Sequence, residues 1–191
     1  MGKIIISENI TLDGIVEDPT GDKESARWFT RIGDDDRAAW AEVEYAEAVG
    51  AAALLMGRRT HSYFLDRGWA SRTGEWADRL RALPKYVVSS SAVEDAGWGE
   101  ATVLAGDVVK EVAKLKEEVD GEIVVYGSGT LVRTLLEHDL ADELRLMTYP
   151  FVVGTGARLF PEAGGVKPAR LSGARPVGTA LVLLTYELIH P

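Results

Sequence analysis

The chain has 191 residues, of which 46% are hydrophobic and 27% are charged, and its formal net charge is -9 at pH 7. These values are typical of a folded domain with a buried core, and the acidic balance argues against binding to nucleic acid or to anionic lipid surfaces. The absence of cysteine excludes disulfides, thiolate metal sites and cysteine nucleophiles. The three histidines, His61, His138 and His190, are scattered and do not predict a metal site.

The first fourteen residues, MGKIIISENITLDG, contain an apolar run that is too short for a signal-peptide core or a membrane span. We therefore expect a cytoplasmic protein that has no membrane partner. Residues 3–7 predict a strand that is buried on both faces. Residues 9–22 are rich in Asp, Gly, Pro and Thr and predict a loop.

Two helical segments are expected next. Residues 25–33 contain Trp28 and Phe29 and indicate a short helix or a partly buried segment. Residues 34–49 predict a longer helix that opens on three aspartates. Asp34 or Asp35 is the expected N-cap, because acidic side chains near a helix N-terminus accept hydrogen bonds from its first amides.

From residue 53 onward, strand and helix patterns alternate. Helices are expected at residues 60–64, 74–83, 107–119 and 130–137. Strands are expected at residues 53–56, 85–89, 101–104, 122–126 and 144–150, followed by an antiparallel pair at residues 169–174 and 181–188. This order predicts an α/β fold with a mixed, mostly parallel sheet and an antiparallel C-terminal hairpin, in a single domain over residues 1–191.

Three of the predicted strands end in small or hydroxyl residues that are followed by a helical pattern. The segments are LLMGRRTHSYF at residues 54–64, VVSSS at residues 87–91 and VVYGSGT at residues 124–130. In open α/β sheets, ligands bind outside the carboxyl ends of the strands, and helix N-termini there accept phosphates. Because Arg58 and Arg59 follow the first strand, the combination predicts a dinucleotide with an extra phosphate, NADP rather than NAD. The alternative is that the glycines only form tight turns.

Several segments resemble dihydrofolate reductase. MGRRTHSYF, KYVVSSS, VVYGSGTLVRTLL and DELRLMTYPFVVGTGARLFP are similar to its cofactor-binding turns and to the strand and loop that follow them. The opening ISENITLDGIVED resembles the start of the reductase domain of the riboflavin-biosynthesis deaminase-reductase, the RibD C-terminal domain, and of small stand-alone relatives. The resemblance covers nearly the whole chain and implies a dihydrofolate reductase-like, three-layer α/β/α fold that uses NADPH.

The resemblance also implies a role for individual residues. Near the nicotinamide it places Asn9 and Ile10, and beside the adenosine it places Ser89 and Ser90. The phosphates would be held by Gly57, Arg58, Arg59, Thr60, Gly127, Ser128, Gly129, Thr130 and Leu131.

The sequence departs from the riboflavin reductase where substrate is bound. Tyr126 stands in place of a glutamate, Ser7 stands in place of a lysine, and the chain has no zinc deaminase domain. Three side chains are candidates for catalysis, and each has a structural alternative. Asp13 is either an acid or a turn residue, and Tyr126 is either a hydrogen-bond donor or a packed aromatic. Glu44 is either a pocket acid or, with Glu42 and Glu47, part of a solvated helix face.

We therefore expect an NADPH-dependent reductase acting on a pterin-like or aminopyrimidine-like heterocycle, with Trp28 and Trp40 as the tryptophans that line a flat ring. The alternative is a protein that binds a nucleotide or heterocycle without turnover. A homodimer is also expected, because residues 180–188 form a long apolar strand whose edge would invite pairing and because such relatives are often dimers.

Overall fold

The computed structural model describes residues 1–16, 24–160 and 165–190. The described chain forms one eight-stranded sheet in the order β4-β3-β2-β5-β1-β6-β8-β7. Its strands are β1 (Lys3–Thr11), β2 (Ala51–Gly57), β3 (Lys85–Val88), β4 (Ala101–Leu104), β5 (Glu122–Tyr126), β6 (Glu143–Tyr149), β7 (Ala169–Val177) and β8 (Leu181–Leu188). Neighbouring strands from β4 to β6 are parallel, whereas β8 is antiparallel to both β6 and β7. This confirms the predicted mixed sheet and its C-terminal hairpin.

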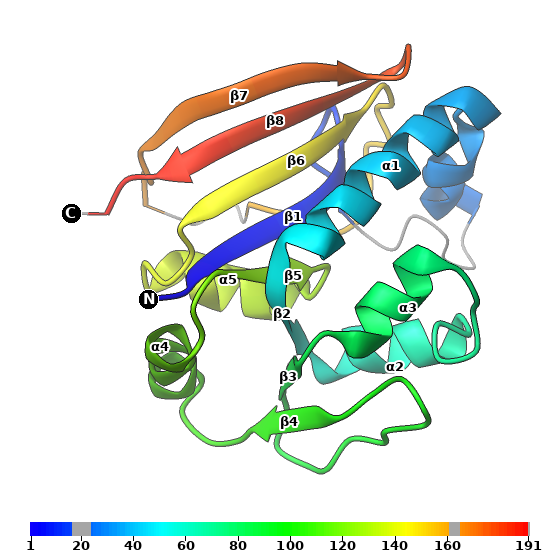
Figure 1. The fold of residues 1–191 in the computed structure, drawn as a ribbon. Coiled ribbons are helices and arrows are strands. Elements are labelled where there is room, and N and C mark those ends of the chain that lie inside the picture. The colour runs from blue at the N-terminus through cyan, green and yellow to red at the C-terminus, as the bar shows by residue number, and fades with distance from the viewer. Residues whose placement is uncertain (17–23, 161–164, 191) are drawn as a thin grey trace.

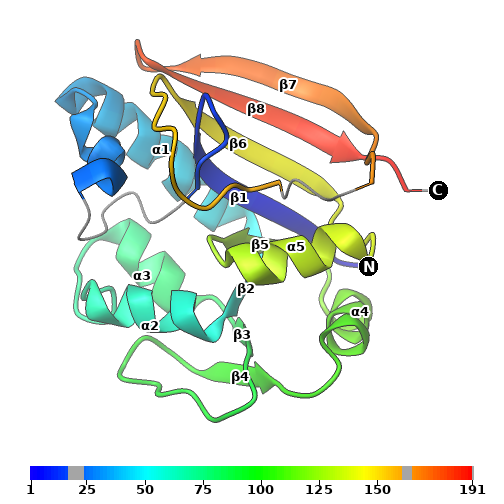
Figure 2. The same ribbon diagram turned by 180° about the vertical axis from the view of Figure 1, so that it is seen from behind.

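Helices cover both faces of the sheet, with α1 in front in Figure 1 and α5 in front in the reverse view of Figure 2. They are a 3-10 helix η1 (Glu24–Arg31) and the α-helices α1 (Asp34–Gly50), α2 (Arg58–Asp66), α3 (Glu75–Ala82), α4 (Val108–Glu118) and α5 (Gly129–Glu137). Because side chains alternate along a strand, Ile4 and Ile6 of β1 pack in the core beneath α4 and α5, while Ile5 packs in the core beneath α1 and α3. The three predicted layers are confirmed. None of the helices in the described residues is long and apolar enough to cross a membrane.

A third apolar cluster, which includes Trp28 and Tyr149, fixes α1 over the end of the sheet. The two rings are 4.9 Å apart in an edge-on arrangement. Asp36, in the first turn of α1, accepts hydrogen bonds from the backbone N–H groups of Thr179 and Ala180 in the β7–β8 turn. The hydrogen bond from Thr179 is the largest cause of a lowered pKa at Asp36.

Two predicted boundaries were wrong. Helix α1 has Gly33, not Asp34 or Asp35, at its N-cap position, and no side chain in the described part of the chain caps it. Residues 9–11 belong to β1 rather than to a loop, because they pair with residues 147–149 of β6. Pairing with a neighbouring strand overrode the local preference for a turn. Residues 17–22 of the predicted loop lie outside the described residues.

The prediction that the last strand is an uncovered edge was also wrong. Strand β8 is paired on both sides, with β6 and with β7, so the edge at that end of the sheet is β7. A homodimer remains a prediction, without the support of an exposed β8 edge.

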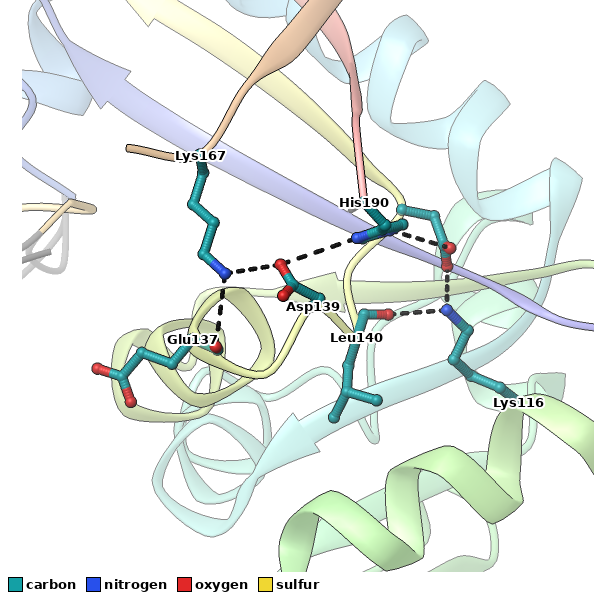
Figure 3. A network of polar contacts seen from close by, with 7 residues as sticks. Lys116, Glu137, Asp139, Leu140, Lys167 and His190 are labelled. Carbon is teal, nitrogen blue, oxygen red and sulfur yellow. Dashed lines mark hydrogen bonds and ion pairs between the residues drawn. The ribbon is translucent and has the colours of Figure 1, made fainter. Parts of the chain in front are cut away.

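A network of polar contacts ties the chain segments that flank the C-terminal hairpin to the α5–β6 connection, as Figure 3 shows. Lys167, before β7, donates to Asp139 at 2.6 Å. His190, after β8, lies 3.9 Å from Asp139 and 3.8 Å from Asp142, which itself pairs with Lys116 at 2.6 Å. None of these five residues lines the cleft described below, and we assign the network a structural role.

Candidate functional site

A cleft of about 1310 Å³ opens at the carboxyl ends of the parallel strands. It is lined by the last residues of β2, β3 and β5, which are Gly57, Val88 and Tyr126, and by the first residues of α2 and α5. The three strand ends that the sequence singled out therefore meet at one cavity, as expected for ligand binding in an open α/β sheet.

The turns at the ends of β2 and β5 are joined by one side chain. The Ser128 hydroxyl accepts a hydrogen bond from the Gly57 N–H at 3.0 Å and donates one to the Thr60 hydroxyl at 2.9 Å. Gly127 and Ser128 both have left-handed backbones, with φ of 58° and 64°, which is a strained conformation for serine. A Cβ at Gly129 would meet no atom within 4 Å, so the surface above the first turn of α5 is open.

Most of the residues predicted to hold the cofactor line this cleft. They are Asn9, Gly57, Arg58, Arg59, Thr60, Gly127, Ser128, Gly129, Thr130 and Leu131.

Ile10, Ser89 and Ser90 are not among the lining residues. The Ile10 side chain is packed in the core, and the Ser89 hydroxyl donates to the Ser91 carbonyl at 2.7 Å. Val88 contributes to the lining instead, because β3 ends one residue earlier than predicted.

The charge of the cleft is opposite to the charge of the whole protein. Its described lining contains two glutamates, Glu8 and Glu44, and seven arginines: Arg37, Arg58, Arg59, Arg67, Arg72, Arg133 and Arg158. In a chain with a net charge of -9, this concentration of arginine creates a local positive potential that favours an anionic ligand.

Asp13 lies outside the cleft lining and holds the loop after β6. Its carboxylate accepts hydrogen bonds from the Thr11 hydroxyl at 2.7 Å and from the N–H groups of Gly154 at 2.7 Å and Val153 at 3.1 Å. These bonds, with that from Thr11 the strongest cause, lower the pKa of Asp13 to about 2. An acid that stays ionised at neutral pH does not donate a proton, so this geometry supports the turn interpretation of Asp13.

Glu44 and Tyr126 both line the cleft. Glu44 is 8% exposed, and burial raises its pKa well above the usual range, with further increases from the charges of Glu47 and Glu8. Burial likewise raises the pKa of the Tyr126 hydroxyl, and the charges of Glu47 and Glu44 add to this effect. Burial thus favours the protonated form of both groups, in which they can donate hydrogen bonds to a ligand.

Glu8 is a lining residue that our sequence analysis missed. It is 7% exposed, its Oε1 atom has no hydrogen-bond partner within the described residues, and burial raises its pKa from 4.5 to about 8. Strand β1 pairs with β5 only as far as Ser7, which lies opposite Tyr126, so Glu8 is the first residue beyond the end of β5. A glutamate between Ile6 and Ile10 on one face of a buried strand was the signal that would have revealed it.

Aromatic rings line the end of the cleft between α1, α2 and α3. Trp76 lies between Trp40 at 5.6 Å and Trp69 at 5.0 Å, measured between ring centroids. Phe29 lies 4.9 Å from Trp40. We call Phe29, Trp40, Trp69 and Trp76 the aromatic wall. Of the two tryptophans expected to line a flat ring, Trp40 lines the cleft, whereas Trp28 is buried in the third core cluster.

Within the described parts of the chain, no group of three or more His, Cys, Asp or Glu side chains is arranged to hold a metal ion. The cleft is therefore characterised by its turns, arginines, aromatic wall and buried carboxyl groups.

Comparisons with known proteins agree with the fold. A Bacillus subtilis (strain 168) protein, YyaP, is 25% identical over 190 residues, covering 97% of this chain and 94% of its own. A second protein of that organism, YwjB, is 34% identical over 71 residues, covering 37% of this chain and 41% of its own.

Solved structures with the same fold include a Shewanella sp. PV-4 protein named for riboflavin biosynthesis, with a TM-score of 0.71, 20% identity, and coverage of 98% of this chain and 99% of that one. A pyrimidine reductase-like protein from Corynebacterium diphtheriae has a TM-score of 0.63 at 12% identity, covering 99% and 92% of the two chains. The family model of the RibD C-terminal domain matches residues 2–183. The chain therefore belongs to the RibD C-terminal domain family.

Proposed function

We propose that this protein is an NADPH-dependent reductase that transfers hydride to a flat, pterin-like or aminopyrimidine-like heterocycle. The observation that supports this best is the junction of the two glycine turns by Ser128, beside Arg58 and Arg59, at the mouth of an arginine-rich cleft. Backbone amides at helix N-termini and arginine side chains are the groups that proteins use to bind phosphates.

The residues present fit the cofactor. No side chain of the described residues caps α5, so its first backbone N–H groups are available to a ligand, and the missing side chain at Gly129 leaves room for a pyrophosphate. Arg58 and Arg59, at the start of α2, offer planar guanidinium groups for the additional phosphate of NADPH. NADPH, when bound, supplies the hydride, while the chain binds and orients the two rings and excludes water.

The acceptor would lie against the aromatic wall, between the cofactor turns and α1. Glu44 and Tyr126 both line the cleft, and burial favours the protonated form of each, so both can donate a hydrogen bond to the acceptor and Glu44 can supply a proton to one of its ring atoms. A solved Thermotoga maritima protein with this fold, of which this chain spans 57%, is named a deaminase and 5-amino-6-(5-phosphoribosylamino)uracil reductase. That name supports a heterocyclic substrate here.

The alternative is a binding protein without turnover. It is favoured by Tyr126 and Ser7, which replace the glutamate and lysine of the riboflavin reductase pattern. The two functions differ in NADPH consumption, because a binding protein would hold the nucleotide without oxidising it in the presence of any heterocycle.

The first test is a titration with NADPH and NADH that follows quenching of Trp40, Trp69 and Trp76. We expect micromolar affinity for NADPH, weaker affinity for NADH, and a loss of this preference of about tenfold or more in Arg58→Ala or Arg59→Ala. Arg175→Ala is the matched control, because Arg175 is exposed on β7 and lies outside the cleft lining.

Equal affinity for the two nucleotides, or the same loss in the Arg175→Ala control, would contradict the assignment of the 2′-phosphate site. Absence of binding by both nucleotides would overturn the proposal. Oxidation of bound NADPH in a screen of pterins and aminopyrimidines would then distinguish the reductase from the binding protein.

A further inference from the structure

The aromatic wall is assembled from separate elements of the chain, and helix α3 lies between them. Trp40 is on α1, Trp69 is in the connection between α2 and α3, and Trp76 is on α3 itself. The ring centroid of Trp76 lies 5.6 Å from that of Trp40 and 5.0 Å from that of Trp69. The spacing of the wall therefore depends on the contacts that hold α1 and the α2–α3 connection to α3.

Arg79 attaches α3 to the end of α1. Its Nε atom donates to the Ala48 carbonyl at 2.9 Å, and its Nη2 atom donates to the Ala51 carbonyl at 2.6 Å. The last carbonyls of a helix have no partner within the helix, and the last turn of α1 has no basic residue of its own. Arg79 therefore satisfies the end of α1 and holds that helix, which carries Trp40, against α3.

Arg81 attaches α3 to the α2–α3 connection. Its Nη1 atom donates to the carbonyls of Trp69, Ala70 and Arg72, at 3.3, 3.0 and 3.1 Å respectively. Its Nη2 atom pairs with Asp78, three residues earlier on α3. One nitrogen of Arg81 thus holds the backbone of the turn that carries Trp69.

These two arginines do not serve the helix to which they belong. Basic side chains in the last turn of a helix often bind its own free carbonyls, but in α3 this role belongs to Lys85, whose Nζ atom donates to the carbonyls of Arg81 at 3.0 Å and Leu83 at 2.9 Å. Side chains two residues apart on a helix point about 200° apart around its axis. Arg79 and Arg81 therefore reach neighbours on opposite sides of α3.

We propose that Arg81 is a positioning residue for the acceptor ring, because it holds Trp69 at the distance from Trp76 that forms the aromatic wall. Arg81 is not among the residues that line the cleft, so it acts through Trp69 and not on the ligand. The energy of contact between aromatic rings depends on their distance and angle, so a displaced Trp69 would pack less well against the acceptor. The role in acceptor binding rests on the proposed function, whereas the positioning of Trp69 does not.

The test uses the electronic coupling of the indole rings as its readout. Two indoles that lie 5.0 Å apart with their planes inclined by 73° give circular-dichroism bands of opposite sign in the far ultraviolet, and this couplet reports their mutual geometry. Because Trp40 and Trp76 also couple, the Trp69→Phe variant defines the part of the couplet that depends on Trp69. We expect Arg81→Met to lose most of that part. Arg81→Lys keeps a cationic donor and should retain more of it than Arg81→Met.

Two controls separate positioning from a general loss of stability. Asp78→Asn removes the ion pair of Arg81 but not its bonds to the turn, so it should keep the couplet. Lys116→Met breaks the pair with Asp142, neither member of which lines the cleft, so it should lower the stability and leave the couplet unchanged. A couplet that is unchanged in Arg81→Met, or that is lost equally in Lys116→Met, would overturn the proposal.

Calorimetric titrations of the same samples with NADPH and with pterin relate the result to the proposed function. Arg81→Met should bind NADPH as the unchanged protein does, because Ser128 and not Arg81 joins the two glycine turns. It should bind pterin about tenfold more weakly. Equal pterin affinity in the two proteins, including absence of binding by both, would overturn the role in acceptor binding. Absence of NADPH binding by the unchanged protein would refute the reductase, and the couplet would still decide whether Arg81 positions Trp69.

Discussion

Replacing Glu8 by glutamine should change how the stability of the protein depends on pH. The folded state raises the pKa of Glu8 from 4.5 to about 8, so between these values the folded protein binds more protons than the unfolded chain. The free energy of unfolding therefore falls as pH rises through this window. One pKa unit corresponds to about 1.4 kcal/mol, and the loss between pH 5 and pH 8 amounts to about 3 kcal/mol. The Glu8→Gln variant lacks this loss, because an amide does not ionise.

Urea unfolding of both proteins at pH 5, 6, 7 and 8 measures the effect. The stability of Glu8→Gln relative to the unchanged protein should rise by about 3 kcal/mol from pH 5 to pH 8. A buried amide without a partner adds a penalty, but that penalty is independent of pH, so the slope isolates the carboxyl group. Glu42→Gln should run parallel to the unchanged protein. A difference between Glu8→Gln and the unchanged protein that stays constant with pH would refute the reasoning.

Two further substitutions test the contacts that shape the cleft. Ser128→Ala should lower the free energy of unfolding by about 1 kcal/mol and weaken NADPH binding, because it removes the link between the two glycine turns. Ser128→Gly should destabilise the protein less, since glycine adopts φ near 64° without strain. Equal losses of stability for the two variants in thermal unfolding would contradict this. Arg145→Met should destabilise the protein by about 3 kcal/mol by leaving Glu47, Glu122 and Glu143 without their shared cation. The double variant Arg145→Met/Glu47→Leu should recover the part of that loss that comes from the buried Glu47, and additive losses in urea unfolding would show that Arg145 and Glu47 are not coupled.

The parts of the site that the sequence predicted are local ones. Gly57 and Gly127 follow apolar strands directly, and the turn chemistry and helix patterns around them depend only on neighbouring residues. Asn9 was expected near the nicotinamide from the resemblance, and it lines the cleft. Its backbone was wrongly assigned to a loop, because it pairs with Met147 of β6, which lies 138 positions away in the sequence. Asp13 and Thr11 are two residues apart, so the turn interpretation of Asp13 was already available from the sequence.

The order of the last strands and the state of the glutamates were not predictable in this way. Nothing in residues 181–188 says whether β8 lies at the edge or inside the sheet, because both positions need the same apolar, β-branched pattern. Glu44 and Glu47 are both glutamates and lie three residues apart on α1, so nothing local in the sequence distinguishes them. Only Glu47 meets Arg145, which lies 98 residues further along the chain.

By itself, the sequence determined which segments become strands and helices and which turns contain glycine, because the hydrophobic period and the turn preference depend only on neighbouring residues. The tertiary structure alone decided which charges are paired. It gave Glu47 an arginine, left Glu8 Oε1 without a hydrogen-bond partner among the described residues, and joined the two glycine turns through Ser128 and Thr60, which are 68 residues apart. Electrostatic partners depend on distance in space, and that distance is set by the packing of the whole sheet.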